Sequence, residues 1–455
     1  MIPIKRSMLL LCVLACAMVS WPGCSRQANL PDPAWTAPIK VTESNDSLVG
    51  GVALYKCLDS IVAIQSPVRY FFMYGDIGGK GSWREQPLTN VAKQYTFKPT
   101  VDQSGGRMLF DQSYVEKQRL EMNALFARMT KNGEFQIEAE RKWTVDKKTL
   151  FGETSSTVLL GETEKRQGLG MLGTGVINDS DMYLPFCLGG TTYRAGTPYA
   201  EGPFTSGVFH STNSGVAWQM ERISDFESED PSVCRSKNYC YYFTPRGLSQ
   251  GYGMWFSRKP VGGDSWEKPG ELTKTYATTY GRYAAAAEVD TVHVCWMDCQ
   301  NDMKRFNVDG PNIENDDIVY CHRKDSDSGW SKEVNLSKGL LYSYPPSMSV
   351  EGNDIVVAWA GIRSAGKHHN EYDQNDIYYV TSKDGGETWT KPLMVTDRAK
   401  DGITSGKPQV LLLRGVIHLF YIQGALEESR KISPGLTKLH QGPWPIYYQH
   451  RPFPN

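Results

Sequence analysis

The chain has 455 residues and carries 49 Lys and Arg against 50 Asp and Glu, so its formal net charge is −1. This balance gives no support for a nucleic-acid partner or for binding to an anionic membrane surface through a basic patch. Aromatic residues make up 11% of the chain, which fits both sheet packing and an aromatic-lined carbohydrate site.

The first residues have the layout of an export signal. Lys5 and Arg6 precede an apolar run of about a dozen residues, which is too short to cross a bilayer as a helix and fits a secretory leader. Gly23 then stands directly before Cys24, and this order resembles the site at which bacterial lipoproteins are cleaved and acylated. We therefore expect residues 1–23 to be removed, giving an envelope lipoprotein (outer membrane or periplasm) or, as the alternative, a secreted protein.

Cys24 is thus the predicted mature N-terminus, with a lipid on its sulfur as the chain's only membrane anchor. Mass spectrometry of protein from the membrane fraction should show a modified Cys24 as the first residue. An unmodified Cys24, or cleavage elsewhere, for instance near residues 15–17, would contradict this prediction.

The body of the chain, residues 24–455, has no Pro-, Ser- or Gly-rich linker, so we expect one domain of 455 − 23 = 432 residues. A strand–turn–strand pattern, typical of a β-hairpin, recurs along this body at residues 51–64, 175–185, 284–296, 346–359 and 408–420. Residues 123–140 also read as a hairpin. The strand predicted at residues 446–449 is placed to pair with one at residues 39–42.

Four segments repeat one layout: an apolar strand, a polar and Gly-rich turn, and a tryptophan. These tryptophans, Trp218, Trp266, Trp330 and Trp389, are 48, 64 and 59 residues apart (266 − 218, 330 − 266, 389 − 330). Repeats at such intervals indicate an array of similar units, and two hairpins per interval give the four strands of a β-propeller blade. The pattern predicts an all-β propeller of six blades, with five or seven as the alternatives, and with these tryptophans largely buried.

The last repeat, SKDGGETW at residues 382–389, matches the Asp box S-x-D-x-G-x-T-W and makes the chain similar to the sialidase superfamily. In such a turn the Asp384 carboxylate and the Ser382 hydroxyl bind backbone groups, and glycines supply positive φ angles. The resemblance implies a divergent sialidase-like (BNR-repeat) propeller. It also implies a site with an arginine triad for a carboxylate, an acid/base Asp, and a tyrosine nucleophile activated by a Glu.

The resemblance can be carried onto several residues of this chain. Glu229 and Asp230, just before a strand, resemble the segment that carries the activating carboxylate, and Tyr344 opens a later strand much as the nucleophile does. Arg246 and Arg305 fall where arginines that clamp the substrate are expected. Arginine is replaced at the first triad position, where the strand reads LVGGVALY at residues 48–55, so we expect weak or no activity on sialosides.

Two further residues end equivalent strands, and the resemblance leaves their role open. Asp298 and Arg363 place a polar group at similar positions in successive repeats, where they line the central funnel or form salt bridges between blades.

The cysteines predict disulfides rather than a metal site. Three of the 10 lie at or before the cleavage site, which leaves 10 − 3 = 7, and no CxxC or Cys/His spacing is typical of a metal site. In an oxidising compartment Cys234 could pair with Cys240 across a hairpin, and Cys295 with Cys321 between strands. We expect no metal and no cofactor.

Two functions remain open from sequence. One is a carbohydrate-active enzyme, a retaining exo-glycosidase that uses Tyr344 with Glu229 or Asp230. The other is a non-catalytic propeller that binds glycans or protein partners through the same funnel, and fold alone does not choose between them. In both cases we expect a monomer with a glycan or glycoconjugate ligand.

Overall fold

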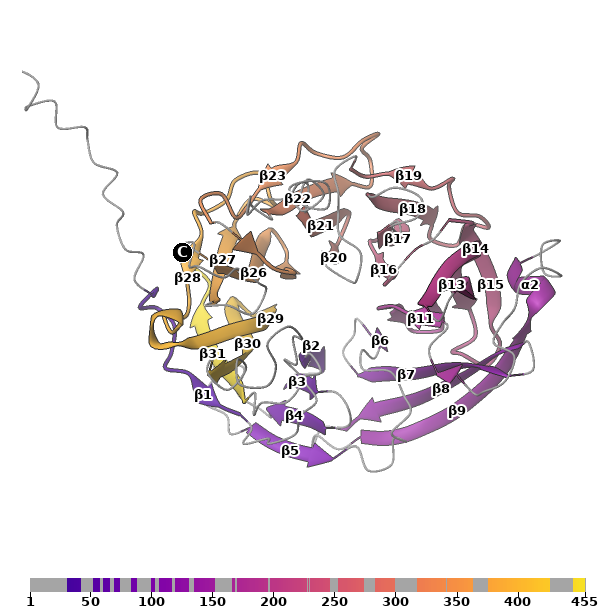
Figure 1. The fold of residues 1–455 in the computed structure, drawn as a ribbon, viewed down its shortest axis with the longest axis horizontal. Coiled ribbons are helices and arrows are strands. Elements are labelled where there is room, and N and C mark those ends of the chain that lie inside the picture. The colour runs from indigo at the N-terminus through magenta and orange to yellow at the C-terminus, as the bar shows by residue number, and fades with distance from the viewer. Residues whose placement is uncertain are drawn as a thin grey trace, which may run out of the picture.

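The computed structural model describes about two thirds of the chain and shows a ring of β-sheets around a central opening (Figure 1). The described residues are 31–41, 52–57, 60–65, 69–73, 83–87, 100–102, 106–116, 119–130, 135–151, 166–167, 170–194, 197–226, 228, 230–245, 253–273, 283–298, 317–340, 342–362, 375–425 and 445–454.

The described residues form seven antiparallel sheets, numbered here in chain order. The first contains β2 (Val52–Cys57), β3 (Ser60–Gln65), β4 (Arg69–Met73) and β5 (Trp83–Pro87). The second contains β6 (Thr100–Val101), β7 (Arg107–Glu116), β8 (Arg119–Met129), β9 (Phe135–Asp146) and β10 (Arg166–Gln167), with helix α2 (Lys147–Phe151) after β9. The third contains β11 (Gly170–Leu172), β12 (Val176–Asn178), β13 (Asp181–Arg194), β14 (Thr197–Ser211) and β15 (Gln219–Ser224).

The remaining sheets repeat the same plan, with an inner strand first and the outer strand last. The fourth contains β16 (Ser232–Arg235), β17 (Tyr239–Pro245), β18 (Met254–Pro260) and β19 (Gly270–Glu271). The fifth contains β20 (Tyr283–Glu288), β21 (Thr291–Asp298), β22 (Asp317–Lys324) and β23 (Val334–Asn335). The sixth contains β24 (Tyr342–Ser343), β25 (Ser347–Glu351), β26 (Asp354–Ile362), β27 (Asp376–Ser382) and β28 (Leu393–Met394). The seventh contains β29 (Ile403–Leu413), β30 (Val416–Ala425), β31 (Ile446–Pro452) and β1 (Ile39–Lys40), and the short 3-10 helix η3 (Ala399–Asp401) precedes it.

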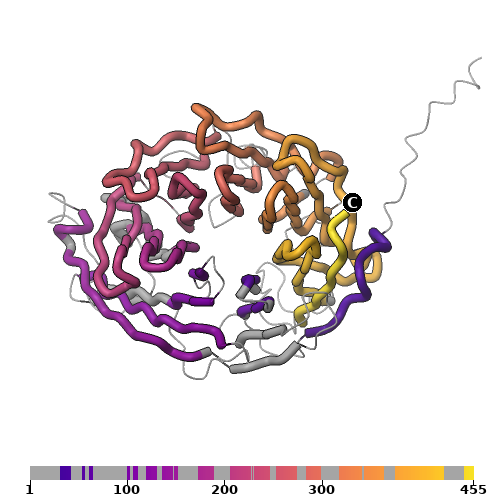
Figure 2. The backbone as a smooth tube through the Cα atoms, turned by 180° about the vertical axis from the view of Figure 1, so that it is seen from behind, coloured from indigo at the N-terminus to yellow at the C-terminus, as the bar shows by residue number. Residues whose placement is uncertain are grey.

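The hydrophobic core is divided into seven clusters, one between each pair of neighbouring sheets. Val62 of β3 packs against Phe110 of β7, for example, and Ile61 on the other face of β3 packs against Tyr448 of β31. The other five clusters join the second sheet to the third, and so on round to the seventh. Alternating side chains thus serve the two faces of each sheet, and the seven sheets follow one another in cyclic order, as the tube in Figure 2 shows.

This architecture is the predicted all-β propeller, but with seven sheets where we expected six blades. The tryptophans marked only the repeats of the third to sixth sheets, so the number of blades had to be extrapolated. Their mean spacing, (48 + 64 + 59)/3 = 57 residues, divides the 432-residue body into between seven and eight units. The spacing was therefore correct, and the preferred count of six blades was too low by one.

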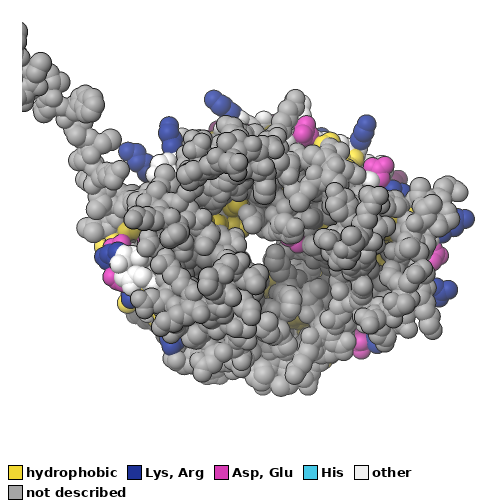
Figure 3. Space-filling model, viewed as in Figure 1, with side chains coloured by type: hydrophobic (Ala, Val, Ile, Leu, Met, Phe, Trp, Pro, Cys, Tyr) yellow, Lys and Arg dark blue, Asp and Glu magenta, His cyan; other side chains and the backbone are white. Residues whose placement is uncertain are grey.

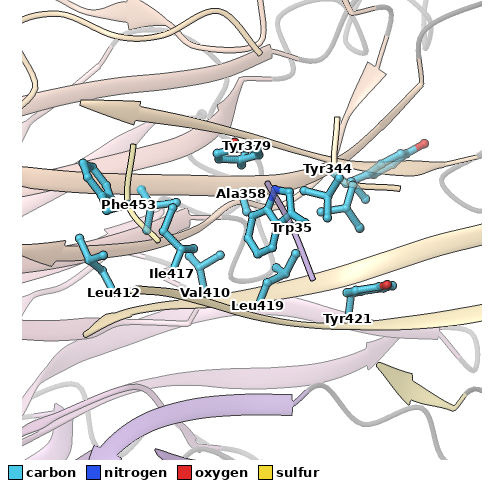
Figure 4. Packing of buried hydrophobic residues seen from close by; sticks show 14 of the residues in the cluster. Trp35, Tyr344, Ala358, Tyr379, Val410, Leu412, Ile417, Leu419, Tyr421 and Phe453 are labelled. Carbon is cyan, nitrogen blue, oxygen red and sulfur yellow. The ribbon is translucent and has the colours of Figure 1, made fainter. Parts of the chain in front are cut away.

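The first and last strands of the described chain meet in the seventh sheet, as the sequence predicted. β1 pairs antiparallel with β31, so that Ile39 lies opposite Tyr448. Just before β1, Trp35 is inserted between the sixth and seventh sheets, where its ring meets that of Tyr379 edge-on at 5.3 Å (Figure 4). The Asp32 carboxylate accepts hydrogen bonds from the Tyr379 hydroxyl and the Arg451 guanidinium. Residues 32–41, which we call the N-terminal clasp, thus contact both the sixth and the seventh sheet and connect them.

The predicted hairpin at residues 123–140 is also present, formed by β8 and β9. The four repeat tryptophans pack against the clusters between sheets and are only partly exposed, in line with the predicted burial.

Neither proposed disulfide forms, because both cysteine pairs are one residue out of register. Cys240 lies opposite Arg235, and Cys234 lies opposite Tyr241, so the two sulfurs point to opposite faces of the fourth sheet. Likewise Cys295 lies opposite Tyr320 on the neighbouring strand. Cys234, Cys240, Cys295 and Cys321 are buried free thiols, and Cys187 is also buried.

Two sheets carry the same buried histidine–tyrosine pair. The imidazole Nδ1 of His293 lies 2.7 Å from the Tyr320 hydroxyl, and that of His418 lies 2.8 Å from the Tyr448 hydroxyl. Both histidines are almost fully buried, at 2% and 0% exposed. Burial, reinforced by a second histidine across the strand pair, lowers the pKa of His293 and of His418 to about 3. Both imidazoles are therefore neutral in the folded protein at neutral pH.

The fold should consequently lose stability in mild acid. An unfolded histidine titrates near pH 6.5, so between pH 6.5 and 3 the unfolded chain binds protons that the folded chain does not, and stability rises with pH. The contribution is fully present above pH 6.5 and is lost as the pH falls toward 3. Between pH 6.5 and 4 each histidine should remove about 3 kcal/mol from the free energy of unfolding.

Urea unfolding of the wild type and of His418→Gln at several pH values from 4 to 7.5 measures this effect. The variant should be less stable at pH 7.5 but should show a shallower fall toward pH 4. Parallel pH profiles for the two proteins would show that His418 does not titrate between the folded and unfolded states.

Candidate functional site

The antiparallel order of the strands gives the ring two different faces. We call one the turn face, because it carries the Gly-rich turns that follow β14, β18, β22 and β27. The opposite face, here the loop face, holds the ends of β17, β21 and β26 and the starts of β16, β20 and β25. A space-filling view shows a hole through the centre of the ring, and described Lys and Arg side chains project from its outer rim (Figure 3).

The turn at residues 382–389 has the hydrogen bonds expected from its sequence. The Ser382 hydroxyl accepts from the Gly386 N–H at 2.9 Å and donates to the Asp384 carboxylate at 2.8 Å. That carboxylate accepts from the N–H and the hydroxyl of Thr388, which lowers the pKa of Asp384 to about 2. The Trp389 indole N–H closes the turn on the Gly386 carbonyl at 3.0 Å.

The turn at residues 211–218 repeats this arrangement with other residues. Ser211 replaces the first serine, and the Asn213 side chain takes the place of the aspartate, with its Oδ1 accepting from the Ala217 N–H at 2.8 Å. The Trp218 indole N–H again donates to a glycine carbonyl, that of Gly215, at 3.1 Å. These turns are structural units, and they hold the turn face together.

The site residues predicted from the sequence that the structure describes lie at or beside strand ends on the loop face. They are Asp230, Asp298 and Tyr344. Five others lie outside the described residues: Cys24, Glu229, Arg246, Arg305 and Arg363. In the chain, Arg246 directly follows β17, Arg363 directly follows β26, and Arg305 lies in the segment between β21 and β22.

Asp230 stands at the start of the fourth sheet in a strained conformation. Its φ angle is 42°, a left-handed value that non-glycine residues seldom adopt. Its main-chain carbonyl accepts a hydrogen bond from the Tyr283 hydroxyl at 2.7 Å, and that hydroxyl also lies 2.8 Å from the Ser232 hydroxyl. Burial raises the pKa of Tyr283 well above its usual value. The segment beside Asp230 is thus held by a neutral phenol from the fifth sheet, a contact that the sequence analysis missed.

Tyr344 is placed in a hydrophobic environment. Its side chain is 7% exposed and belongs to the cluster between the sixth and seventh sheets, together with Val410 and Leu419 (Figure 4). Its backbone N–H donates to the Ala360 carbonyl at 2.8 Å. This position faces the seventh sheet, whereas Asp230 lies beyond the fifth sheet on the other side. In the order of the ring, the fifth sheet therefore stands between the sheets that carry Tyr344 and Asp230.

Aspartates occupy several strand ends at the loop face, and two of them accept hydrogen bonds there. Asp298 is 9% exposed and lies opposite Asp317 across β21 and β22. The Asp317 carboxylate accepts a hydrogen bond from the Ser337 hydroxyl at 3.1 Å, and 59 residues later Asp376 accepts one from Thr396 at 2.8 Å. Burial raises the pKa of both Asp317 and Asp376, and hydrogen bonds partly offset it. This Asp–Ser/Thr pair, 20 residues apart in both sheets, is a second repeat signal that could have been found in the sequence.

The densest charged cluster lies on the turn face, away from the predicted site. His210 has one ring nitrogen 2.7 Å from Asp181 and the other 2.7 Å from Glu221. Lys259 and Arg235 complete the cluster, binding Glu221 at 2.8 Å and Asp181 at 3.0 Å respectively. Burial opposes charge here, but the hydrogen bonds raise the pKa of His210 and lower that of Glu221 to about 2. Opposite charges in this cluster form ion pairs with one another, and these pairs link the third sheet to the fourth.

The described residues contain no group of three or more His, Cys, Asp or Glu side chains placed to hold a metal ion. No helix among them is long and apolar enough to span a membrane.

No family model and no curated protein matches the sequence. Among solved structures the chain is similar to YCF48 bound to a D1 peptide, with 12% identity and a TM-score of 0.44, covering 94% of this chain and 97% of that one. It is also similar to a Trypanosoma rangeli sialidase mutant with trans-sialidase activity, with 11% identity and a TM-score of 0.43, covering 93% of this chain but only 60% of that one. It is similar as well to an endosialidase of phage phi92, with 11% identity and a TM-score of 0.42, covering 93% of this chain and 70% of that one. Similarity at this level assigns no activity.

Proposed function

We propose that the protein is an exported, sialidase-like propeller that recognises glycans at its loop face. The observation that carries this proposal is the position of Asp298 at the loop-face end of β21. In the sequence, Arg246 and Arg363 directly follow β17 and β26, two strands that end on the same face. Arginine forks bind carboxylates in two-point fashion, and a set of them suits an anionic sugar. Arg305, between β21 and β22, belongs to the same proposed surface.

The described residues favour recognition over hydrolysis. A tyrosine nucleophile needs an adjacent carboxylate base within hydrogen-bond reach, because a phenol with a pKa near 10 is a weak nucleophile at neutral pH. Tyr344 is 7% exposed among aliphatic side chains, and the fifth sheet separates its strand from the Asp230 segment. We therefore place Glu229, Asp230 and the arginines in a binding role and give Tyr344 a packing role. The retaining glycosidase is the rival function.

Arg246→Ala should weaken binding of an anionic glycan at least tenfold, which corresponds to about 1.4 kcal/mol. Arg246→Lys should recover little of it, since an ammonium cannot form the two-point contact. Glycan-array screening followed by calorimetry on the best ligand measures both. Arg222→Ala is the matched control, because Arg222 is exposed on β15, the outer strand of the third sheet. Equal losses for Arg222 and Arg246 would contradict a specific site.

The same purified protein distinguishes the rival function when it is tested on chromogenic glycosides. Recognition without catalysis predicts no turnover in the wild type, and unchanged glycan affinity in a folded Tyr344→Phe variant. Turnover that is lost both in Tyr344→Phe and in Glu229→Gln would establish the glycosidase instead.

A further inference from the structure

The second sheet ends in an outer strand of unusual length. β9 (Phe135–Asp146) has 12 residues, whereas the outer strands of the fourth, fifth and sixth sheets, β19, β23 and β28, have two each. At about 3.3 Å per residue, β9 presents an edge of roughly 40 Å. β9 pairs with β8 on one side, and no other strand in the described part of the chain pairs with it on the other.

The position and exposure of β9 leave this edge accessible. In Figure 1 the strand follows the outer circumference of the ring, and no labelled element lies outside it. Eight of its side chains are exposed, among them Glu140, Arg141 and Lys142, and Ile137 is 44% exposed. An edge of unpaired N–H and C=O groups is a template for another strand, and its charged side chains decide which strand is tolerated.

The charge pattern of β9 is complementary to itself. When a second β9 is placed antiparallel about Arg141, opposite residues have numbers that add to 282. Glu140 of each copy then lies opposite Lys142 of the other, and Ala139 lies opposite Trp143. The intramolecular contact of Glu140 with Lys142, at 3.3 Å, shows that the two side chains lie on one face of the strand and within reach of each other. Only the central Arg141 pair brings like charges together.

We propose that β9 is a dimerisation edge, where two copies of this chain pair antiparallel through Glu140–Lys142 contacts and join their second sheets. This contact is isologous, as in most homodimers, because the same residues serve both partners. It revises the monomer expected from the sequence. The regular part of β9 after the bulge at Phe126/Ala127, residues 139–146, forms the centre of the contact.

Sedimentation equilibrium on the purified chain should give twice its 51.0 kDa mass as concentration rises. Glu140→Lys and Lys142→Glu should each weaken the dimer roughly tenfold, because each places two like-charge pairs across the interface. Both side chains are exposed, at 47% and 67%, so both variants should fold, which their melting temperatures check. An equal mixture of the two variants should form a heterodimer at least as stable as the wild type, since its pairs are again of opposite charge.

A matched control applies the same exchange to an ion pair on another surface, in which the lysine is 62% and the aspartate 25% exposed. Asp397→Lys or Lys400→Asp, whose contact lies before the seventh sheet, should leave association unchanged. Arg141→Cys should form a disulfide-linked dimer on oxidation, because residue 141 lies opposite itself, and Thr144→Cys should not. A wild type that stays monomeric at all concentrations, or single variants that dimerise as well as the wild type, would overturn the proposal.

Discussion

Gly386→Ala is expected to lower the free energy of unfolding by roughly 2–5 kcal/mol. The backbone at Gly386 has a φ angle of 95°, which strains any residue with a Cβ atom. In addition, a Cβ placed there would lie 1.9 Å from the Tyr320 hydroxyl of the fifth sheet. Since that hydroxyl bonds His293, its displacement would also disturb a buried pair. The glycine thus lets the turn of one sheet close onto its neighbour.

The adjacent Gly385 supplies the control for backbone strain. Its φ angle is 73°, also left-handed, but the nearest atom to an added Cβ is Asn353 Oδ1 at 3.9 Å. Gly385→Ala should therefore cost only the conformational term, about 1–2 kcal/mol. Denaturant unfolding of both variants gives the difference, which measures the contact with Tyr320. Equal losses would mean that this contact between sheets contributes nothing.

Asp32→Ala should destabilise the fold by about 3–5 kcal/mol, because it leaves a buried arginine without its counter-charge. The Arg451 and Asp32 side chains are 9% and 14% exposed, and burial already lowers the pKa of Arg451. The Tyr379 hydroxyl would lose its acceptor at the same time. Thermal and urea unfolding of the variant measure the loss.

An exposed ion pair serves as the control for Asp32→Ala. The Arg398 and Asp401 side chains are each 48% exposed, and their charged groups lie 3.0 Å apart. Asp401→Ala should therefore change the free energy of unfolding by only about 0–1 kcal/mol. Replacing both members of the buried pair, as in Asp32→Leu with Arg451→Met, should recover part of the loss, since no charge then remains unpaired. If Asp32→Ala lowered the free energy of unfolding no more than Asp401→Ala does, the contacts of the N-terminal clasp would not stabilise the last two sheets.

Local patterns in the sequence predicted the elements of this fold well. The hairpin at residues 123–140 and the pairing of residues 39–42 with 446–449 both rest on apolar alternation and turn residues, and both are present. The preferred blade count was too low because only four repeats carry a tryptophan turn. Register was the second failure: Cys234 and Cys240 flank a hairpin turn, but only the observed pairing of Arg235 with Cys240 reveals that they face opposite ways.

The site was less predictable than the fold. The antiparallel order carries Asp230, Asp298 and Tyr344 to strand ends on one face, which the sequence anticipated. Whether a side chain at such an end points to the centre or into the space between sheets depends on the neighbouring sheet. Tyr344 packs against the seventh sheet, and Tyr283, which has no motif around it, reaches the Asp230 segment instead. No local pattern records these contacts between sheets.

The pairing of β1 with β31 also has a consequence for how the chain folds. It joins residues 448 − 39 = 409 positions apart, nearly the whole length of the protein. Contacts of such long range form slowly, because a long loop must be closed before they gain any stability. Residues 39–40 have no partner strand until residues 446–452 have been synthesised. We therefore expect this seam to be the last part of the ring to form, and deletion of those C-terminal residues to leave a nearly complete chain unable to close.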